Sequence, residues 1–133
     1  MTNPDRPTEG LRVLLVEDNA DISRTLVKLL RKFGYEPRVA YDGPAALREV
    51  EAAMPDVVLL DIGLPGLDGW EVARRIRRRV QEKRPLIIAV TGYGADKDRE
   101  LSERAGVDLH LTKPADPQLL RLLLAEFGRQ QGR

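Results

Sequence analysis

Polar residues that could bind a phosphoryl group and a metal ion stand at the ends of separate apolar runs. Glu17 and Asp18 follow residues 13–16, Asp61 follows 57–60, Thr91 follows 86–90, and Lys113 comes just after 109–111. If these runs are parallel strands, their carboxyl ends meet at one edge of a sheet, where open α/β folds place their ligand sites. Carboxylates gathered there with a lysine and a hydroxyl would form a site for a divalent cation and a phosphoryl group.

Asp61 is the predicted nucleophile of this site. A carboxylate can accept a phosphoryl group and form an acyl phosphate. Because Glu17 and Asp18 would repel an incoming phosphate, we expect a hard divalent cation such as Mg²⁺, which prefers oxygen ligands, to bridge the carboxylates and the phosphate. Lys113 would neutralise charge on the phosphoryl oxygens, and the Thr91 hydroxyl would donate a hydrogen bond to one of them.

Each of these residues also has an ordinary structural explanation when it is taken alone. An acidic pair after a strand commonly caps a helix, and an aspartate at a strand end is commonly a turn residue. A lone threonine can cap a helix in the same way, and a lone lysine is usually a solvated surface charge. Structural roles would not require all of them to stand at strand ends, so we interpret them as one site.

The elements that position these residues alternate along the chain. Residues 12–16, 57–60 and 86–90 are apolar almost throughout, which is typical of strands covered by helices on both faces. A shorter, more polar strand is expected near 36–41, at an edge of the sheet. Segments of helical period lie between the strands; the first, after Asn19, carries Ile22, Leu26, Leu29, Leu30 and Phe33 on one face. The pattern predicts an α/β fold, (βα)5, with a doubly wound parallel five-stranded sheet.

Length and composition indicate one domain, over residues 11–127. We expect a disordered lead-in at 1–10 and a polar tail at 128–133. The 22 Lys and Arg residues nearly balance the 21 Asp and Glu residues, so no overall field favours nucleic acid or a membrane. Cysteine is absent, which excludes disulfides and thiolate chemistry. No apolar run approaches the roughly 20 residues that span a bilayer. We expect a cytoplasmic protein.

Four motifs together resemble the receiver domain of two-component response regulators. They are Val-Leu-Leu-Val-Glu-Asp-Asn at 13–19, Asp-Ile-Gly-Leu-Pro-Gly-Leu-Asp-Gly at 61–69, Val-Thr-Gly at 90–92 and Leu-Thr-Lys-Pro at 111–114. The resemblance covers about residues 11 to 127 and implies the flavodoxin-like strand order 2-1-3-4-5. It also implies a phosphorylation-dependent signalling switch of a phosphorelay, which accepts a phosphoryl group on Asp61 from a histidine kinase or a histidine phosphotransfer domain.

The resemblance further implies which residues would hold Mg²⁺ or Mn²⁺. Glu17 and Asp18 match the acidic pair of the family, with Asp18 as a direct ligand and Glu17 acting through water. Asp61 and the main-chain carbonyl of Gly63 would complete the protein ligands.

Other positions match the family's switch machinery. Thr91 and Lys113 match the switch hydroxyl and the lysine, and the bond before Pro114 is expected to be cis. His110 stands where the family usually has a Tyr or Phe switch residue. Two interpretations of His110 stay open: a switch whose coupling varies with pH, or a partly buried strand residue. The lifetime of the phosphorylated state, which the residues at Gly63 and Tyr93 influence in the family, also stays open.

We expect the protein to catalyse its own phosphorylation and slow self-dephosphorylation, without turnover of external substrates. Its output would pass to a downstream protein target that the sequence does not identify, and it would be a monomer or weak dimer. The arginines in 74–79 are interpreted as a solvated helix face, so neither nucleic acid nor a membrane is an expected partner. The chain could be a single-domain regulator or a receiver from a longer hybrid kinase.

The sequence leaves three alternatives to this prediction. A flavodoxin would need a hydroxyl-rich phosphate loop after the first strand, where this chain has Glu17-Asp18-Asn19. An aspartate-nucleophile phosphohydrolase would need a second Asp two residues after Asp61, where this chain has Gly63. A receiver-like docking module, whose phosphorylation is incidental, remains the main alternative.

Overall fold

The computed structural model describes residues 10–64, 66–79, 85–92 and 96–130. Strands and helices alternate along this part of the chain: β1 (Val13–Val16), α1 (Ala20–Lys32), β2 (Arg38–Ala40), α2 (Gly43–Ala52), β3 (Val57–Asp61), α3 (Gly69–Arg79), β4 (Leu86–Thr91), α4 (Asp96–Ala105), β5 (Leu109–Thr112) and α5 (Pro117–Gln130). The strands form one parallel five-stranded sheet in the order β2-β1-β3-β4-β5. The predicted (βα)5 architecture and strand order are therefore confirmed.

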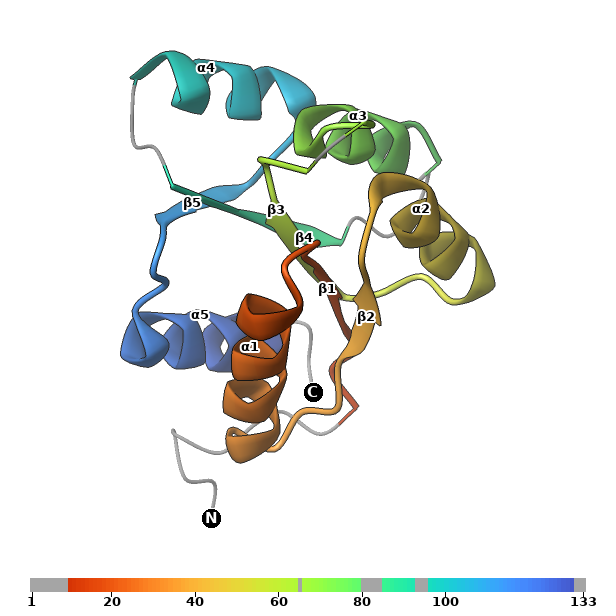
Figure 1. Ribbon diagram of the computed structural model, residues 1–133. Coiled ribbons are helices and arrows are strands. Elements are labelled where there is room, and N and C mark those ends of the chain that lie inside the picture. The colour runs from red at the N-terminus through yellow and green to blue at the C-terminus, as the bar shows by residue number, and fades with distance from the viewer. Residues whose placement is uncertain (1–9, 65, 80–84, 93–95, 131–133) are drawn as a thin grey trace.

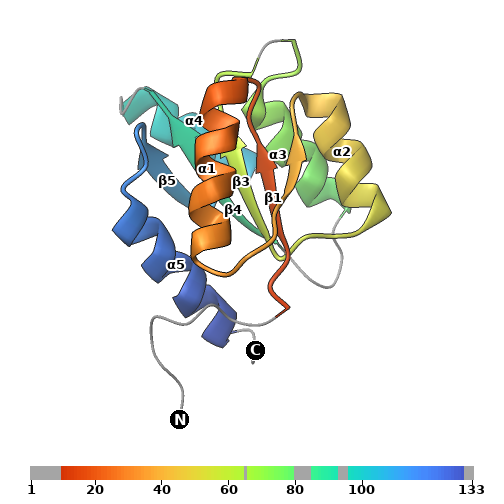
Figure 2. The same cartoon turned by 60° about the horizontal axis from the view of Figure 1, so that its bottom comes forward.

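Helices cover both faces of the sheet, as Figures 1 and 2 show. α1 and α5 lie on one face, while α2, α3 and α4 lie on the other. Successive strand residues point to opposite faces, so Leu14 packs under α2 and α3 while Leu15 packs under α1 and α5. This is why β1, β3 and most of β4 are buried along their whole length and contain no alternating polar residues.

Short polar side chains start the helices immediately after the strand ends. Asn19 Oδ1 accepts the N–H of Ile22 at 3.0 Å, and Asp42 Oδ1 accepts the N–H of Ala45 at 2.7 Å. Such N-caps satisfy amide groups that have no partner inside the helix. The caps fix the loops at the carboxyl edge of the sheet, which is the edge that carries the candidate site.

The end of the last helix differs from the expectation. α5 continues to Gln130, through residues that were predicted to begin a polar tail at 128. Gly128 is buried in that last turn, so tertiary packing outweighs the low helix propensity of glycine. Ile22, which shares the predicted apolar face of the first helix, is 37% exposed at the start of α1. Residues 1–9 of the predicted lead-in lie outside the described residues.

Arg77 ties α3 to the opposite, amino-terminal edge of the sheet. Its guanidinium donates to the carbonyl oxygens of Gly106 at 2.8 Å and Pro85 at 2.7 Å, and it pairs with the carboxylate of Asp108. Asp108 in turn accepts the N–H of Ile87 at 2.9 Å. The Arg77 side chain is only 13% exposed, so the interpretation of residues 74–79 as a solvated arginine face is wrong for this one residue.

Within the described ranges, no helix combines the length and apolar character needed to cross a bilayer.

Replacing Arg77 with methionine should destabilise the protein, because the apolar stem stays while two part-buried carbonyls and a carboxylate lose a charged donor. We expect the free energy of unfolding to fall by about 2–3 kcal/mol, the usual cost of losing hydrogen bonds to a charged group. Urea denaturation of Arg77→Met measures this loss. Arg78→Met, at the exposed neighbouring position, is the matched control and should change stability by less than about 0.5 kcal/mol. Equal effects of the two substitutions would contradict the structural role of Arg77.

Candidate functional site

The predicted site residues converge at the carboxyl edge of the sheet. Glu17 follows β1, Asp61 ends β3, Thr91 ends β4 and Lys113 follows β5. The register of the parallel strands aligns these ends, because Val16 pairs with Leu60 and Asp61 pairs with Val90. Residues that are far apart in the sequence therefore meet in one place, as a parallel sheet requires.

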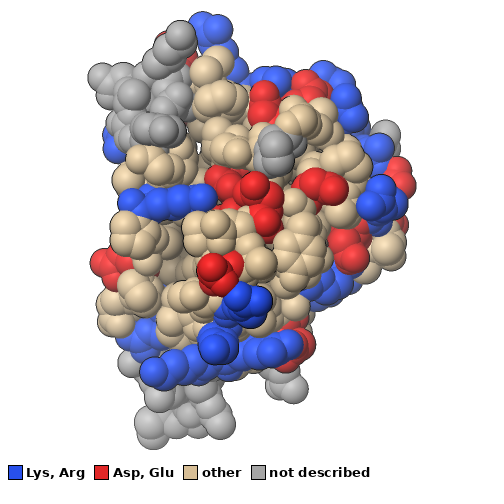
Figure 3. All heavy atoms as spheres, in the orientation of Figure 1, with Lys and Arg blue, Asp and Glu red and all other residues tan. Residues whose placement is uncertain are grey.

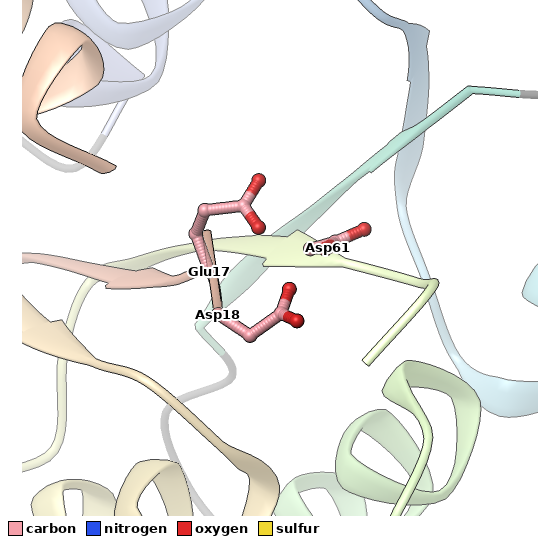
Figure 4. A group of neighbouring side chains, drawn as sticks. All are labelled: Glu17, Asp18 and Asp61. Atoms are coloured by element: carbon pink, nitrogen blue, oxygen red, sulfur yellow. The ribbon is translucent and has the colours of Figure 1, made fainter. Parts of the chain in front are cut away.

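Three carboxylates form a compact acidic cluster. One oxygen from each of Glu17, Asp18 and Asp61 lies within 4.8 Å of the others. Figure 4 shows the three side chains directed toward a common point, and Figure 3 shows acidic side chains gathered at the centre of this face. Glu17 and Asp61 are buried, whereas Asp18 is exposed. An all-oxygen donor set that is open to water on one side fits Mg²⁺, which keeps several of its own waters.

Lys113 supplies the positive charge of the site. Its Nζ lies 3.1 Å from Glu17 Oε1 and 3.2 Å from Asp61 Oδ1, and its side chain is 26% exposed. The N–H of Gly63 donates to the same Asp61 oxygen at 2.9 Å. The acceptor carboxylate is thus held by two donors from different loops, which limits its rotation.

The electrostatics of the cluster favour a proton when no metal ion is bound. Burial, together with a hydrogen bond shared with Asp61, raises the pKa of Glu17 from 4.5 to about 7, although the Asn19 N–H and Lys113 oppose this shift. Burial works to lower the pKa of Lys113, but its contacts with Glu17 and Asp61 outweigh burial and raise it. Near neutral pH Glu17 is therefore partly protonated, and a divalent cation would displace that proton.

Mg²⁺ affinity should rise with pH through the neutral range, because binding requires ionised Glu17. With the pKa of Glu17 at about 7, the affinity at pH 8 should exceed that at pH 6 by about tenfold, since metal binding competes with the proton. Calorimetric titration with Mg²⁺ in buffers of different ionisation enthalpy measures both the affinity and the released proton.

Glu17→Gln is the control for this prediction, and it should abolish the proton release near neutral pH. Release that is unchanged in the variant would assign the proton to another group.

In the metal-free wild type, the folded state binds the Glu17 proton more tightly than the unfolded state does. Its free energy of unfolding should therefore fall as pH rises from about 4.5 to about 7.

The remaining predicted residues have mixed outcomes. Thr91 is buried at the end of β4, and its carbonyl oxygen accepts the N–H of Lys113 at 2.7 Å. The peptide bond between Lys113 and Pro114 is cis. His110 is half-buried in β5, opposite Ala89, so both interpretations of this residue stay open. The Gly63 carbonyl as a metal ligand remains a prediction, and Tyr93 lies outside the described residues.

Sequence reasoning missed a groove that begins at the site. It runs between α1 and the start of α5, has a volume of about 920 Å³, and reaches Lys113 at one end. Ile22, Leu26 and Leu29 of α1 form much of its apolar lining. The signal was present in the sequence, because the apolar face of α1 extends back to its first turn. Only the packed structure shows that, among the residues it describes, no other element covers that part of the face.

The family is shown by comparison with known proteins. The family model of the response regulator receiver domain matches residues 13–125. The chain therefore belongs to the response regulator receiver domains, the phosphorelay modules of two-component signalling, and the expected family is confirmed.

Individual relatives agree with this assignment. The sensory transduction protein RegX3 of Mycobacterium tuberculosis is 41% identical over 102 residues, which cover 77% of this chain and 44% of RegX3. The chain thus spans less than half the length of this curated relative. The receiver domain of the sensor histidine kinase PA1611 of Pseudomonas aeruginosa has a TM-score of 0.82 and 35% identity, covering 90% of this chain and 98% of that one. It was solved with a magnesium ion coordinated in its active-site cleft.

A second solved structure is the receiver domain of Ssk1 from Saccharomyces cerevisiae. It has a TM-score of 0.85 and 27% identity to this chain, covering 96% of this chain and 94% of that one. It was crystallised together with the histidine phosphotransfer signaling protein Ypd1.

Proposed function

We propose that this chain is a phosphorylation-dependent switch that accepts a phosphoryl group on Asp61 from a phosphohistidine donor and then presents an altered surface to a protein target. The observation that carries the proposal is the position of Lys113 Nζ, 3.2 Å from Asp61 Oδ1, beside the acidic cluster of Glu17, Asp18 and Asp61. A buried nucleophilic carboxylate with an adjacent cation and a metal-ligand set is what phosphoryl transfer requires, because this reaction depends mainly on positioning and charge stabilisation.

Each residue of the site has its own role in the transfer. An Asp61 oxygen forms a bond to phosphorus as the bond from phosphorus to the donor nitrogen breaks, so the product is an acyl phosphate. Lys113 can turn from Glu17 to an oxygen of the arriving phosphoryl group, and the Thr91 hydroxyl would donate to another. Mg²⁺, held by Asp18, Asp61 and the Gly63 carbonyl, with Glu17 acting through water, would offset the negative charge that accumulates there.

Phosphorylation should require both Asp61 and Mg²⁺. Incubating the protein with a small acyl phosphate or phosphoramidate and Mg²⁺ should add one phosphoryl group, detected by mass spectrometry of the intact protein. Asp61→Asn, or omission of the metal ion, should prevent this gain.

Two outcomes would contradict the proposal in different ways. Full labelling of Asp61→Asn would show that another residue is the acceptor. No labelling of the wild type, while a control receiver labels in parallel, would favour a docking module whose phosphorylation is incidental.

The groove beside the site supports a protein as the phosphoryl donor. The Ssk1 receiver, a structural neighbour, was solved with a histidine phosphotransfer protein. Here the apolar groove lies between α1 and α5 and ends at Lys113, so a donor helix placed in it would bring its histidine to the site. Helix-in-groove docking needs an apolar lining with polar rims, and Lys28 and Lys32 stand among the groove residues with Ile22 and Leu26.

Ile22→Glu should affect phosphoryl transfer from a protein donor but not from a small-molecule donor. A charge in the apolar groove should slow transfer from a phosphorylated histidine phosphotransfer protein by about tenfold, a loss usual for one central interface side chain. Labelling by a small acyl phosphate should stay unchanged, because Ile22 does not touch Asp61. Rates would be measured by intact-mass spectrometry with any phosphotransfer protein that phosphorylates the wild type.

Leu122→Glu is the matched control for this experiment. Leu122 is a leucine of α5 that is 46% exposed and lies outside the groove, so both rates should stay unchanged. If Ile22→Glu slowed both donors equally, the residue would act on the site or the fold and not on docking.

The proposal also covers expectations that concern the whole protein. It places the switch in the cytoplasm, where phosphohistidine is made from ATP. It includes self-catalysed phosphorylation and slow self-dephosphorylation without turnover of external substrates, and a receiver domain at 11–127.

A further inference from the structure

Gly69, the first residue of α3, lies directly against the segment that carries the phosphoacceptor. Its N–H donates to the carbonyl oxygen of Ile62 at 3.3 Å. Ile62 is itself held to the neighbouring strand, because its N–H donates to the carbonyl oxygen of Val90 at 3.3 Å. These two hydrogen bonds close the base of the loop that connects Asp61 with α3.

A side chain at position 69 would not fit this arrangement. A Cβ atom on Gly69 would lie 2.6 Å from the carbonyl oxygen of Asp61 and 2.7 Å from Ile62 Cα, both inside the 3.0 Å that real Cβ atoms keep. It would also lie 3.1 Å from Ile62 Cδ1. The two closest atoms belong to the main chain at the end of β3, so only a movement of the helix start or of the strand end could relieve the overlap.

Gly69 differs in this respect from other glycines of the described structure. A Cβ on Gly106 would press on the side chain of Arg77, and one on Gly43 would meet Leu67. A Cβ on Gly63 would reach Asp61 Oδ1 only at an ordinary 3.6 Å. The overlap at Gly69 therefore falls on the phosphoacceptor's own main chain.

We propose that Gly69 is a positioning residue for phosphoryl transfer. The missing side chain lets the start of α3 lie against the main chain of Asp61, and this contact fixes where the Asp61 carboxylate stands. The inference rests on the proposed function, because it concerns the same acceptor and the same metal ion.

The geometry of the site explains why a small displacement would matter. Asp61 Oδ1 is placed 2.9 Å from the Gly63 N–H nitrogen and 3.2 Å from Lys113 Nζ, and the carboxylates share a cluster within 4.8 Å. A shift of the Asp61–Ile62 peptide would move the carboxylate relative to all of these groups. Mg²⁺ demands near-ideal octahedral geometry, and misplacing a reacting group by about 1 Å can cost about 100-fold in rate.

Gly69→Ala tests this role through two measurements, the affinity for Mg²⁺ and the rate of phosphoryl transfer to Asp61. We expect the dissociation constant for Mg²⁺ to rise at least about fivefold, and the rate of labelling by an acyl phosphate at saturating Mg²⁺ to fall about 10- to 100-fold. Calorimetry and intact-mass spectrometry give these values, and circular dichroism checks that the variant remains folded.

Ile76→Val is the matched control, because Ile76 is a fully buried residue of the same helix about two turns further on. It should lower the melting temperature without changing the Mg²⁺ dissociation constant or the labelling rate. If Gly69→Ala behaved like this control, with only a lower melting temperature, Gly69 would be a packing residue and the proposal would be overturned.

A double variant removes the nearest side-chain contact. Gly69→Ala with Ile62→Val lacks the Ile62 Cδ1 atom but keeps both main-chain overlaps, so the binding and rate defects should persist. Recovery of wild-type Mg²⁺ binding would overturn the proposal. If neither alanine variant folds, Mg²⁺ binding is measured on Asp68→Ala instead. This substitution adds no atom, and it removes the hydrogen bond from the Glu71 N–H to Asp68 Oδ1 that caps the start of α3. Weaker Mg²⁺ binding would support the proposal, and unchanged binding would overturn it.

Measurements on the wild type distinguish failure of this inference from failure of the proposed function. If the wild type neither binds Mg²⁺ nor gains a phosphoryl group, the proposed function fails. If the wild type does both and Gly69→Ala does so equally well, only the positioning role fails.

Discussion

Repulsion between carboxylates is the constraint around which this structure is arranged. Glu17 and Asp61 are buried at neighbouring strand ends with Asp18 beside them, an arrangement that is unfavourable unless positive charge or a proton compensates it. Lys113 provides part of that compensation, while burial and the hydrogen bond with Asp61 still raise the pKa of Glu17. A divalent cation would therefore offset the remaining negative charge of the site, and with Lys113 it would also offset the charge that a phosphoryl group adds.

The acidic cluster stands on a sheet whose strands and helices are held at both edges. The strands beneath the site are buried on both faces, and N-caps such as Asn19 fix the loops at the site edge. At the opposite edge, Arg77 joins α3 to Gly106 and Asp108. Main-chain and charged contacts thus hold the elements at both edges of the sheet. The close contact of Gly69 with the Asp61 main chain extends the same support to the acceptor itself.

Much of the fold and of the site could be predicted because both depend on local patterns. Apolar strands, caps such as Asn19 and the order of motifs specified a parallel α/β sheet, and the polar residues at its strand ends specified the site. Predictions failed where long-range packing decides. Gly128 continues α5 because it is buried, and Arg77 lies inside the α3–β5 junction instead of on a solvated face.

The sequence alone determined the kinds of residue that meet at the site and the edge at which they meet. The reason is that the order of residues fixes which side chain follows each strand, and parallel strands all end at the same edge. The tertiary structure alone decided their distances, including the 3.2 Å between Lys113 Nζ and Asp61 Oδ1, and the groove that ends beside them. Distances of this kind depend on the packing of elements from distant parts of the chain. The pKa of Glu17 belongs with them, because it follows from burial and from neighbours such as Asp61 that only folding brings close.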